Sequence, residues 1–160
     1  MRPDSLSLRA SAVAFTALAL LCALTACGDS DTVKLEDYGT RDVTLPGGEL
    51  IHAEVASTQP QVQKGLMFRT SLAPDRGMLF LFSKEDSLQF WMFQTLIPLD
   101  IVWMDASRCI VEISPDTPPC KTKASLCADY GGHQTAQFVL ELGGGEARRL
   151  GLTVGQTLEF

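Results

Sequence analysis

The sequence is short of positive charge and of the motifs that mark the common enzyme classes. Its 160 residues include 13 Lys and Arg against 19 Asp and Glu, a formal net charge of −6 at pH 7. Binding to a nucleic-acid phosphate backbone requires a basic surface, so this balance argues against nucleic acid as a partner. There is no internal repeat, P-loop, dinucleotide-binding glycine fingerprint or Gly-x-Ser-x-Gly motif. We therefore predict no cofactor.

Histidine is also scarce, and no metal-binding spacing is present. His52 falls on the polar face of a predicted strand and His133 falls in a glycine loop, and neither has a Ser or Cys nucleophile in a recognisable arrangement. The cysteines lack the paired Cys-x-x-Cys spacing of zinc sites. Four methionines are scattered over separate predicted elements, which favours core packing over copper binding: Met67, Met78, Met92 and Met104. We predict no metal site.

The N-terminus has the organisation of an export signal. Arg2 and Arg9 precede an uncharged, Ala- and Leu-rich run over residues 10–26, and this is a positive region followed by an apolar one. The alternative is a membrane-spanning anchor, but a span requires about 20 apolar residues, and this run is shorter. The sequence therefore predicts a signal peptide over residues 1–26.

The end of that run resembles the bacterial lipobox. Leu24-Thr25-Ala26-Cys27 places small residues before a cysteine whose thiol would accept lipid. Cys27 is thus the predicted lipidation site and the first residue of the mature chain, and the membrane is a partner through that lipid. Gly28, rather than aspartate, follows Cys27. If the host has two membranes, we expect the outer one, with the domain facing the periplasm.

The mature chain divides into a tether and one domain. Residues 27–42 are polar and acidic and are predicted to lift the domain off the membrane. Residues 43–160 are long enough for one β-rich domain with a core. In an oxidising compartment a disulfide is expected between Cys120 and Cys127. Cys109, in an apolar run, is expected to remain a buried free thiol.

Short apolar runs separated by turns predict a mainly β fold. Residues 49–55 alternate apolar and polar side chains, as a half-buried strand does. Thr58, with Pro60 and Gln61 after it, predicts a short helix that Gly65 ends. A turn is expected at residues 105–108, and one or two helical turns at residues 146–150. Further strands are predicted at residues 78–82, 88–93, 99–104, 109–113, 137–142 and 156–160. The fold class is therefore mainly β with two short helices (α+β), as a small single-domain barrel or sandwich.

Several of these segments together resemble the family catalogued as domain of unknown function 192. The matching segments are Gln63-Lys64-Gly65-Leu66-Met67-Phe68-Arg69, Arg76-Gly77-Met78-Leu79-Phe80, Phe90-Trp91-Met92-Phe93-Gln94-Thr95-Leu96-Ile97-Pro98-Leu99-Asp100-Ile101, Pro119-Cys120, Phe138-Val139-Leu140-Glu141-Leu142 and Arg149-Leu150-Gly151-Leu152. The resemblance implies a compact, mainly β fold, often behind a signal peptide, and no agreed activity. Members typically carry Lys-Asn where this chain has Phe93-Gln94, so a site built on that pair is not expected here.

Four residues near predicted element ends are candidates for binding a small polar ligand or a peptide: Arg69, Trp91, Thr95 and Asp100. Loop residues at strand ends are free to bind, whereas mid-strand apolar residues are committed to packing. We expect any pocket in this domain to be lined by at least two of them. The alternatives are a structural ion pair for Arg69 with Asp100 or another carboxylate, and a core position for the aromatic side chains on both faces of their strand.

The absence of a catalytic constellation favours a non-enzymatic function. The sequence predicts a membrane-tethered lipoprotein of the cell envelope that acts as a binding or assembly module. The alternative is an envelope hydrolase acting on wall or glycan substrates through Asp100, Glu141 and Arg69. Convergence of these groups in one pocket would favour the enzyme, whereas their separation would favour the binding module. The sequence gives no indication of the oligomeric state.

Overall fold

The structure is a computed structural model that describes residues 38–160. The predicted signal peptide, Cys27 and most of the predicted tether lie outside the described residues. Residues 40–42, assigned to the tether from their polar character, form the start of a strand that pairs along its whole length with the next one. No helix within the described residues is long and apolar enough to cross a membrane.

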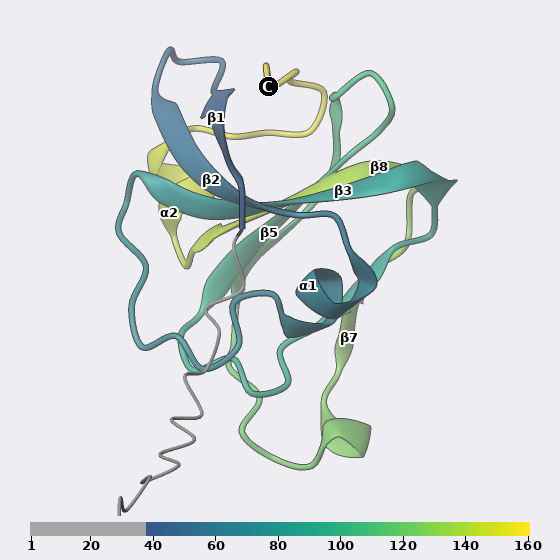
Figure 1. Cartoon of the computed structure of the whole chain (residues 1–160). Coiled ribbons are helices and arrows are strands. Elements are labelled where there is room, and N and C mark those ends of the chain that lie inside the picture. The colour runs from purple at the N-terminus through teal and green to yellow at the C-terminus, as the bar shows by residue number, and fades with distance from the viewer. Residues whose placement is uncertain (1–37) are drawn as a thin grey trace, which may run out of the picture. The chain divides into compact units, whose positions relative to one another are not determined.

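A six-stranded sheet organises the fold (Figure 1). Its strand order is β1 (Thr40–Thr44), β2 (Leu50–Ala56), β3 (Arg76–Asp86), β8 (Ala136–Gly143), β5 (Leu99–Met104) and β6 (Ile110–Thr117). Neighbours are antiparallel except β2 and β3. That parallel pair needs a crossover connection, which contains helix α1 (Gln59–Lys64). Strands β4 (Gln89–Trp91) and β7 (Asp129–Gly131) form a separate antiparallel pair.

Both faces of the sheet are covered, which gives a layered α+β arrangement rather than a closed barrel. One face packs against α2 (Glu146–Arg149) and the C-terminal residues, around Leu79, Val102 and Leu140. The other packs beneath α1 and β4, around Phe80, Met92 and Trp103. Every residue of β5 is buried, as expected for a strand covered on both sides. The predicted fold class is confirmed.

Local signals in the sequence correspond to observed elements. The backbone N–H of Thr58 donates to Gln61 Oε1 at 3.1 Å, and Gly65 ends α1 with a φ of 46°. At the β5–β6 turn, Asp105 Oδ1 accepts from the backbone of Ser107 and Cys109, both at 2.9 Å. Capping and turn chemistry were therefore sufficient to place this helix and this hairpin.

The last predicted strand, residues 156–160, is not a strand of the sheet. Thr157 forms an isolated bridge with Cys109, and Glu159 forms one with Thr44. The segment thus connects the end of edge strand β1 to the residue that precedes edge strand β6. Its apolar residues face the core instead, because Leu158 is fully buried.

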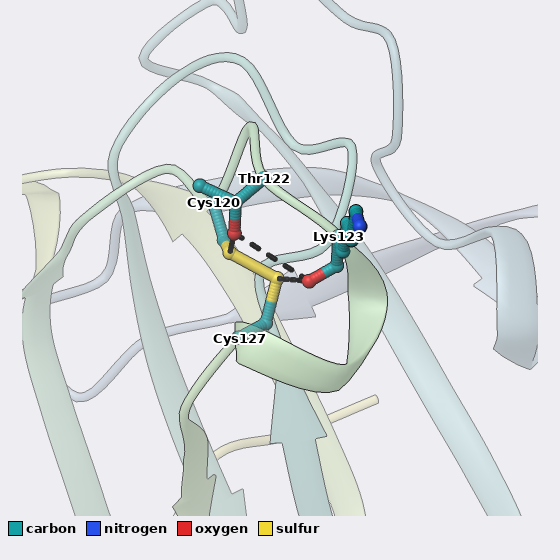
Figure 2. Close-up of a disulfide and its surroundings, with 4 residues drawn as sticks. All are labelled: Cys120, Thr122, Lys123 and Cys127. Carbon is teal, nitrogen blue, oxygen red and sulfur yellow. Dashed lines mark hydrogen bonds between the residues drawn. A yellow bond between two sulfur atoms is a disulfide. The ribbon is translucent and has the colours of Figure 1, made fainter.

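The predicted disulfide is present (Figure 2). Cys120 and Cys127 are joined with a Cα–Cα distance of 5.8 Å, and a short 3₁₀ helix, η1 (Ala124–Leu126), lies within the loop they close. Cys109 is the free cysteine among the described residues and is half-buried. The bridge joins Cys127, which precedes β7, to Cys120. The backbone N–H of Cys120 donates to the carbonyl of Met92, and the N–H of Gln94 donates to the carbonyl of Cys120, both after β4.

Candidate functional site

Two glutamates and one methionine form a row across the α1 face of the sheet. Glu54 on β2 pairs in register with Met78 on β3, and Met78 pairs with Glu141 on β8. Alternation places all three on the face that carries Phe80 and Ile101. With neighbouring strands about 4.8 Å apart, the two glutamate backbones lie about 10 Å from each other. Two carboxyl groups therefore lie on the same face of the sheet, with Glu141 buried and Glu54 partly exposed.

Glu141 is a buried carboxyl without a partner for one of its oxygens. The residue is 4 % exposed, and among the described residues nothing hydrogen-bonds to Oε2. Burial raises the pKa of Glu141 to about 8, against the opposing effect of the positive charge of Arg69. Glu141 is therefore largely protonated and neutral at pH 7, and it can donate one hydrogen bond.

Glu54 has the opposite electrostatic environment because Arg69 binds it directly. Arg69 Nη1 and Nη2 donate to Glu54 Oε1 and Oε2, both at 2.6 Å. This two-pronged geometry is the strong form of an arginine–carboxylate pair. The hydrogen bond from Arg69 lowers the pKa of Glu54 despite its partial burial, and the same bond raises the pKa of Arg69. Arg69 thus pairs with Glu54, and its charge is compensated.

The loop after α1 begins with a glycine, Gly65, that lies beside Phe80 and Glu141. A Cβ on Gly65 would lie 3.4 Å from the ring of Phe80 and 3.8 Å from Glu141 Oε2, at a positive φ of 46°. These distances are ordinary van der Waals contacts, so it is the positive φ that favours glycine at this position. Further along, the N–H of Phe68 donates to the carbonyl of Gln94 at 2.9 Å. Phe68 and Gln94 have φ values of 65° and 56°, which are strained for side chains of this size.

A small cavity lies where this loop meets the sheet. Its volume is about 30 Å³, and Thr95 and Glu141 line it together with Trp91 and the α1 loop. A larger hollow of about 210 Å³ is lined by Val62, Gln63, Phe82, Leu88, Gln89, Phe90 and Trp91. The two share Val62, Gln63, Phe90 and Trp91. We call the first the Glu141 cavity and the second the Trp91 groove.

The aromatic residues of β4 divide between core and surface. Phe90 makes edge-to-face contacts with Phe80 and Trp103, at ring-centre distances of 4.9 and 6.0 Å. Trp91 is 41 % exposed and packs against Phe93 at 5.4 Å. The aromatic side chains are therefore not core on both faces of this strand. Trp91 presents ring surface to the groove.

Asp100 lies on the opposite face of the sheet and binds backbone N–H groups. It is fully buried and accepts hydrogen bonds from the backbone N–H groups of Asp116, Gly145 and Ala147, at 2.7, 3.0 and 2.6 Å. It pairs in register with Leu142, on the face of the sheet opposite Glu141. The set proposed for a hydrolase (Asp100, Glu141 and Arg69) is therefore not assembled in one place.

The four candidates predicted from the sequence are thus only partly brought together. Trp91 and Thr95 line the Glu141 cavity, and Thr95 is 4 % exposed. Arg69 lies near enough to Glu141 to influence its charge, whereas Asp100 lines neither the cavity nor the groove. We expected at least two of the four candidates to line any pocket. The cavity meets this expectation, whereas Trp91 alone of the four lines the groove. The expectation also fails for a third hollow of about 270 Å³ beside Pro98 and Gly144, which none of the four lines.

Sequence reasoning missed Glu54, although a signal was available. Glu54 shares its alternation phase with Ala56 as well as with His52, so the apolar residue at the end of the strand was a signal that this end of the face is covered. Glu141 was considered only as part of the hydrolase set, yet a lone acid within a run of buried apolar residues is itself the mark of an unusual carboxyl. Both histidines lie at the surface and pair with acids, His52 with Asp42 and His133 with Glu112.

Within residues 38–160, no group of three or more His, Cys, Asp or Glu side chains is arranged to hold a metal ion. The chemistry available at the cavity is that of a neutral carboxyl, a threonine hydroxyl and an aromatic wall, with Gln63 and Lys64 also in the lining.

Two crystal structures are similar to this chain. One is a protein of unknown function from Novosphingobium aromaticivorans, with 32 % identity and a TM-score of 0.72, over 79 % of this chain and 89 % of that one. The other, from Sinorhizobium meliloti, is provisionally described as a transcription regulator and has 32 % identity and a TM-score of 0.69, over 76 % and 94 % of the two chains. No curated protein matches the sequence significantly. The model of domain of unknown function 192, described as an uncharacterized ACR, matches residues 43–160, and the chain belongs to that family.

Proposed function

We propose that the protein is a lipid-anchored binding module of the bacterial cell envelope and that its ligand site is the Glu141 cavity with the adjoining Trp91 groove. In this function the domain carries out no chemistry on the ligand. It holds a small molecule at the surface of the membrane to which Cys27 is attached.

The observation that carries the binding proposal is the unpartnered oxygen of Glu141. Leaving a buried polar atom without a hydrogen bond costs about 1–3 kcal/mol, and such atoms are rare in folded proteins. Here the atom belongs to a residue that lines a cavity, next to a groove with an exposed tryptophan. A concave, mainly apolar surface with a few convergent polar groups is the usual form of a small-molecule site.

The strained backbone around the cavity supports the same proposal. Phe68 and Gln94 hold left-handed conformations where the α1 loop joins the turn after β4. Conformations of this kind cost about 1–3 kcal/mol each and cluster at ligand-binding segments. Phe68 falls within a segment that matches the family, whereas Gln94 stands where members typically carry Asn.

The membrane part of the proposal depends on the N-terminal sequence. The lipobox-like Leu24-Thr25-Ala26-Cys27 follows an export-type apolar run, and stable anchoring requires two or more acyl chains. Replacing the acceptor thiol by Cys27→Ser should leave an uncleaved precursor, detected by intact mass and detergent partitioning. Normal maturation of that variant to a water-soluble form would contradict lipidation. Gly28 at the next position supports sorting to the outer membrane in a two-membrane host, which membrane fractionation tests.

The binding part is tested by native mass spectrometry of the lipidated chain. The protein is incubated with the low-molecular-mass fraction of a bacterial envelope digest and then desalted. We expect a retained small molecule that is lost in Glu141→Leu and in Trp91→Ala. The matched control is Val154→Ala, at an exposed position that lines neither the cavity nor the groove. Absence of any retained molecule on the wild-type chain, or equal retention by all four proteins, would refute the proposal.

A further inference from the structure

The Glu141 cavity also constrains what kind of ligand it accepts. We infer that the ligand inserts a neutral carboxamide group into the cavity, where it pairs with the carboxyl of Glu141, and lays an apolar body along the Trp91 groove. This inference rests on the proposed binding function and adds the chemical class of the ligand.

The size of the cavity limits the inserted group. A volume of about 30 Å³ accommodates two or three water-sized groups, since a single water needs about 10–15 Å³ measured in this way. The carbonyl oxygen and the nitrogen of an amide are two such groups. A sugar ring or an aromatic ring is too large for the cavity and must stay in the wider groove, which has about 210 Å³.

The hydrogen-bonding character of the cavity calls for a group that both donates and accepts. A protonated carboxyl offers one O–H donor and one carbonyl acceptor side by side, and an amide offers the complementary pair. Thr95, which lines the same cavity, adds a hydroxyl that can take either role. A ligand group that displaces a well-ordered water without reproducing its hydrogen bonds loses affinity. An apolar tip would leave Oε2 of Glu141 unpartnered.

Charged tips are disfavoured by the groups around the cavity. An anionic tip would have to compete for Arg69, whose two Nη atoms already bind Glu54 at 2.6 Å. The same holds for Lys64, which lines the cavity and already has an interaction partner. A cationic tip would require Glu141 to ionise in a buried position, and it would lie near the positive charge of Arg69. A neutral amide avoids both costs, because no charge has to be moved out of water.

The groove specifies the rest of the molecule. Five of its seven lining residues are apolar or aromatic, and Gln63 and Gln89 supply the polar part. Trp91 offers exposed ring surface, which packs well against a flat apolar body. Amides joined to such a body occur in peptides with an apolar side chain and in acetamido sugars, whose ring has an apolar face. Both share the chemistry that the cavity recognises.

The test uses probes that differ only in the tip. Isothermal titration at pH 6.5 compares benzamide, benzoate and benzylamine on the mature chain. We expect benzamide to bind at least tenfold more tightly than either charged analogue. Tighter binding of benzoate or benzylamine, or no saturable binding of benzamide, overturns the inference. N-acetyl-phenylalaninamide and N-acetylglucosamine then distinguish the two sources, since the natural one should bind more tightly than benzamide.

Variants at Glu141 show whether the carboxyl is responsible. Glu141→Gln keeps a donor and an acceptor and should bind benzamide within a few-fold of the wild type. Glu141→Leu has neither and should lose at least tenfold, with Thr153→Ser as an exposed control. Equal binding by Glu141→Leu and wild type would overturn the inference even if benzamide binds.

The pH dependence provides a second readout. The ionisable groups around Glu141 are Lys64 at the end of α1, Arg69 in the loop after it, Glu54 on β2, and Tyr38 at the edge of this core. Benzamide affinity should be flat below pH 7 and fall above pH 8 in the wild type, as Glu141 loses its proton, and should not fall in Glu141→Gln. A fall shared by both proteins would assign the titration to another group and remove this support.

Failure of the amide probes, with an envelope molecule still retained through Glu141 and Trp91, would refute the amide and leave the binding function standing.

Discussion

Glu54 and Glu141 point from the same face of the sheet on either side of Met78, but only Glu54 has a guanidinium bound to it. Two chemically identical groups, on backbones about 10 Å apart, therefore have pKa values shifted in opposite directions. The arginine bond lowers the pKa of Glu54, and burial raises that of Glu141 to about 8. Separation of this kind gives a protein one permanently charged and one neutral carboxyl at the same pH.

Replacing Glu141 by Gln should stabilise the domain at neutral pH. The folded chain holds Glu141 protonated, whereas the unfolded chain ionises it above about pH 4.5. The stability that Glu141 contributes is therefore fully present below pH 4.5 and is lost as the pH rises towards 8. At pH 7 the penalty is about 3 kcal/mol. Urea unfolding of both proteins between pH 4 and 9 should show a smaller decline with pH for Glu141→Gln; parallel curves would contradict a buried, protonated Glu141.

Replacing Arg69 by Ala should destabilise the domain by about 1–3 kcal/mol at pH 7, because it leaves the carboxylate of Glu54 partly buried and unpaired. The value stays below that of a fully buried pair, since the two side chains are 31 % and 20 % exposed. The pair contributes fully above the usual pKa of Glu54 and less as the pH falls through its lowered value.

The matched control for Arg69→Ala is Arg148→Ala. Arg148 makes a 3.8 Å contact with Asp116 between exposed side chains, and its loss should change stability by less than about 0.5 kcal/mol. Thermal melts of both variants at pH 7 and pH 4 provide the comparison. Equal losses of stability in the two variants would show that the Arg69–Glu54 pair stabilises the fold no more than an exposed ion pair does.

Replacing Asp100 by Asn should cost about 2–4 kcal/mol. The side-chain amide cannot accept on its nitrogen, so at least one of the backbone donors that Asp100 holds would face another donor. The closest of these donors is the N–H of Ala147, at 2.6 Å, so a side-chain NH₂ facing it would cause the strongest repulsion. Denaturant unfolding should detect the loss, with surface Asp129→Asn as control. Benzamide affinity should be retained, because Asp100 lies on the far face of the sheet; its loss in a folded variant would place Asp100 in the binding site after all.

Removing the disulfide with Cys120→Ser and Cys127→Ser should destabilise the domain by about 2–3 kcal/mol, from the loop-closure entropy of an eight-residue loop. Alkylation of the unreduced, denatured and processed chain should find one free thiol, Cys109. Two additional thiols would show that the bridge is absent from the purified protein. Because Cys120 bonds to the turn that carries Gln94, the fluorescence of nearby Trp91 should also change.

Local patterns in the sequence were enough for the elements but not for the site. Thr58, Gln61 and Gly65 define α1 because capping is a short-range interaction, and the alternation over residues 49–55 reports one covered face. The pairing of Arg69 with Glu54 joins residues 15 positions apart across the crossover between β2 and β3. Such a pair depends on strand order, and no local pattern encodes it.

The two candidate acids illustrate the same limit. Asp100 and Glu141 are both acidic residues within apolar strands, and the sequence treats them alike. They lie on adjacent strands, but Ile101 rather than Asp100 is opposite Glu141. A register difference of one residue therefore sends their side chains to opposite faces. Asp100 accepts hydrogen bonds from backbone N–H groups, whereas Glu141 lines the cavity with one oxygen unpartnered.

The position of β8 determines when the six-stranded sheet can form during synthesis and folding. The strand made of Ala136–Gly143 lies between β3 and β5 in the middle of the sheet, although it is the last strand in the chain. Until it is inserted, β3 and β5 each present an open hydrogen-bonding edge that can pair with another chain. Insertion depends on contacts between residues far apart in sequence, which form slowly. A chain stopped before residue 136 would thus have two half-sheets and no Glu141, so the nascent protein is vulnerable to aggregation until its final segment arrives.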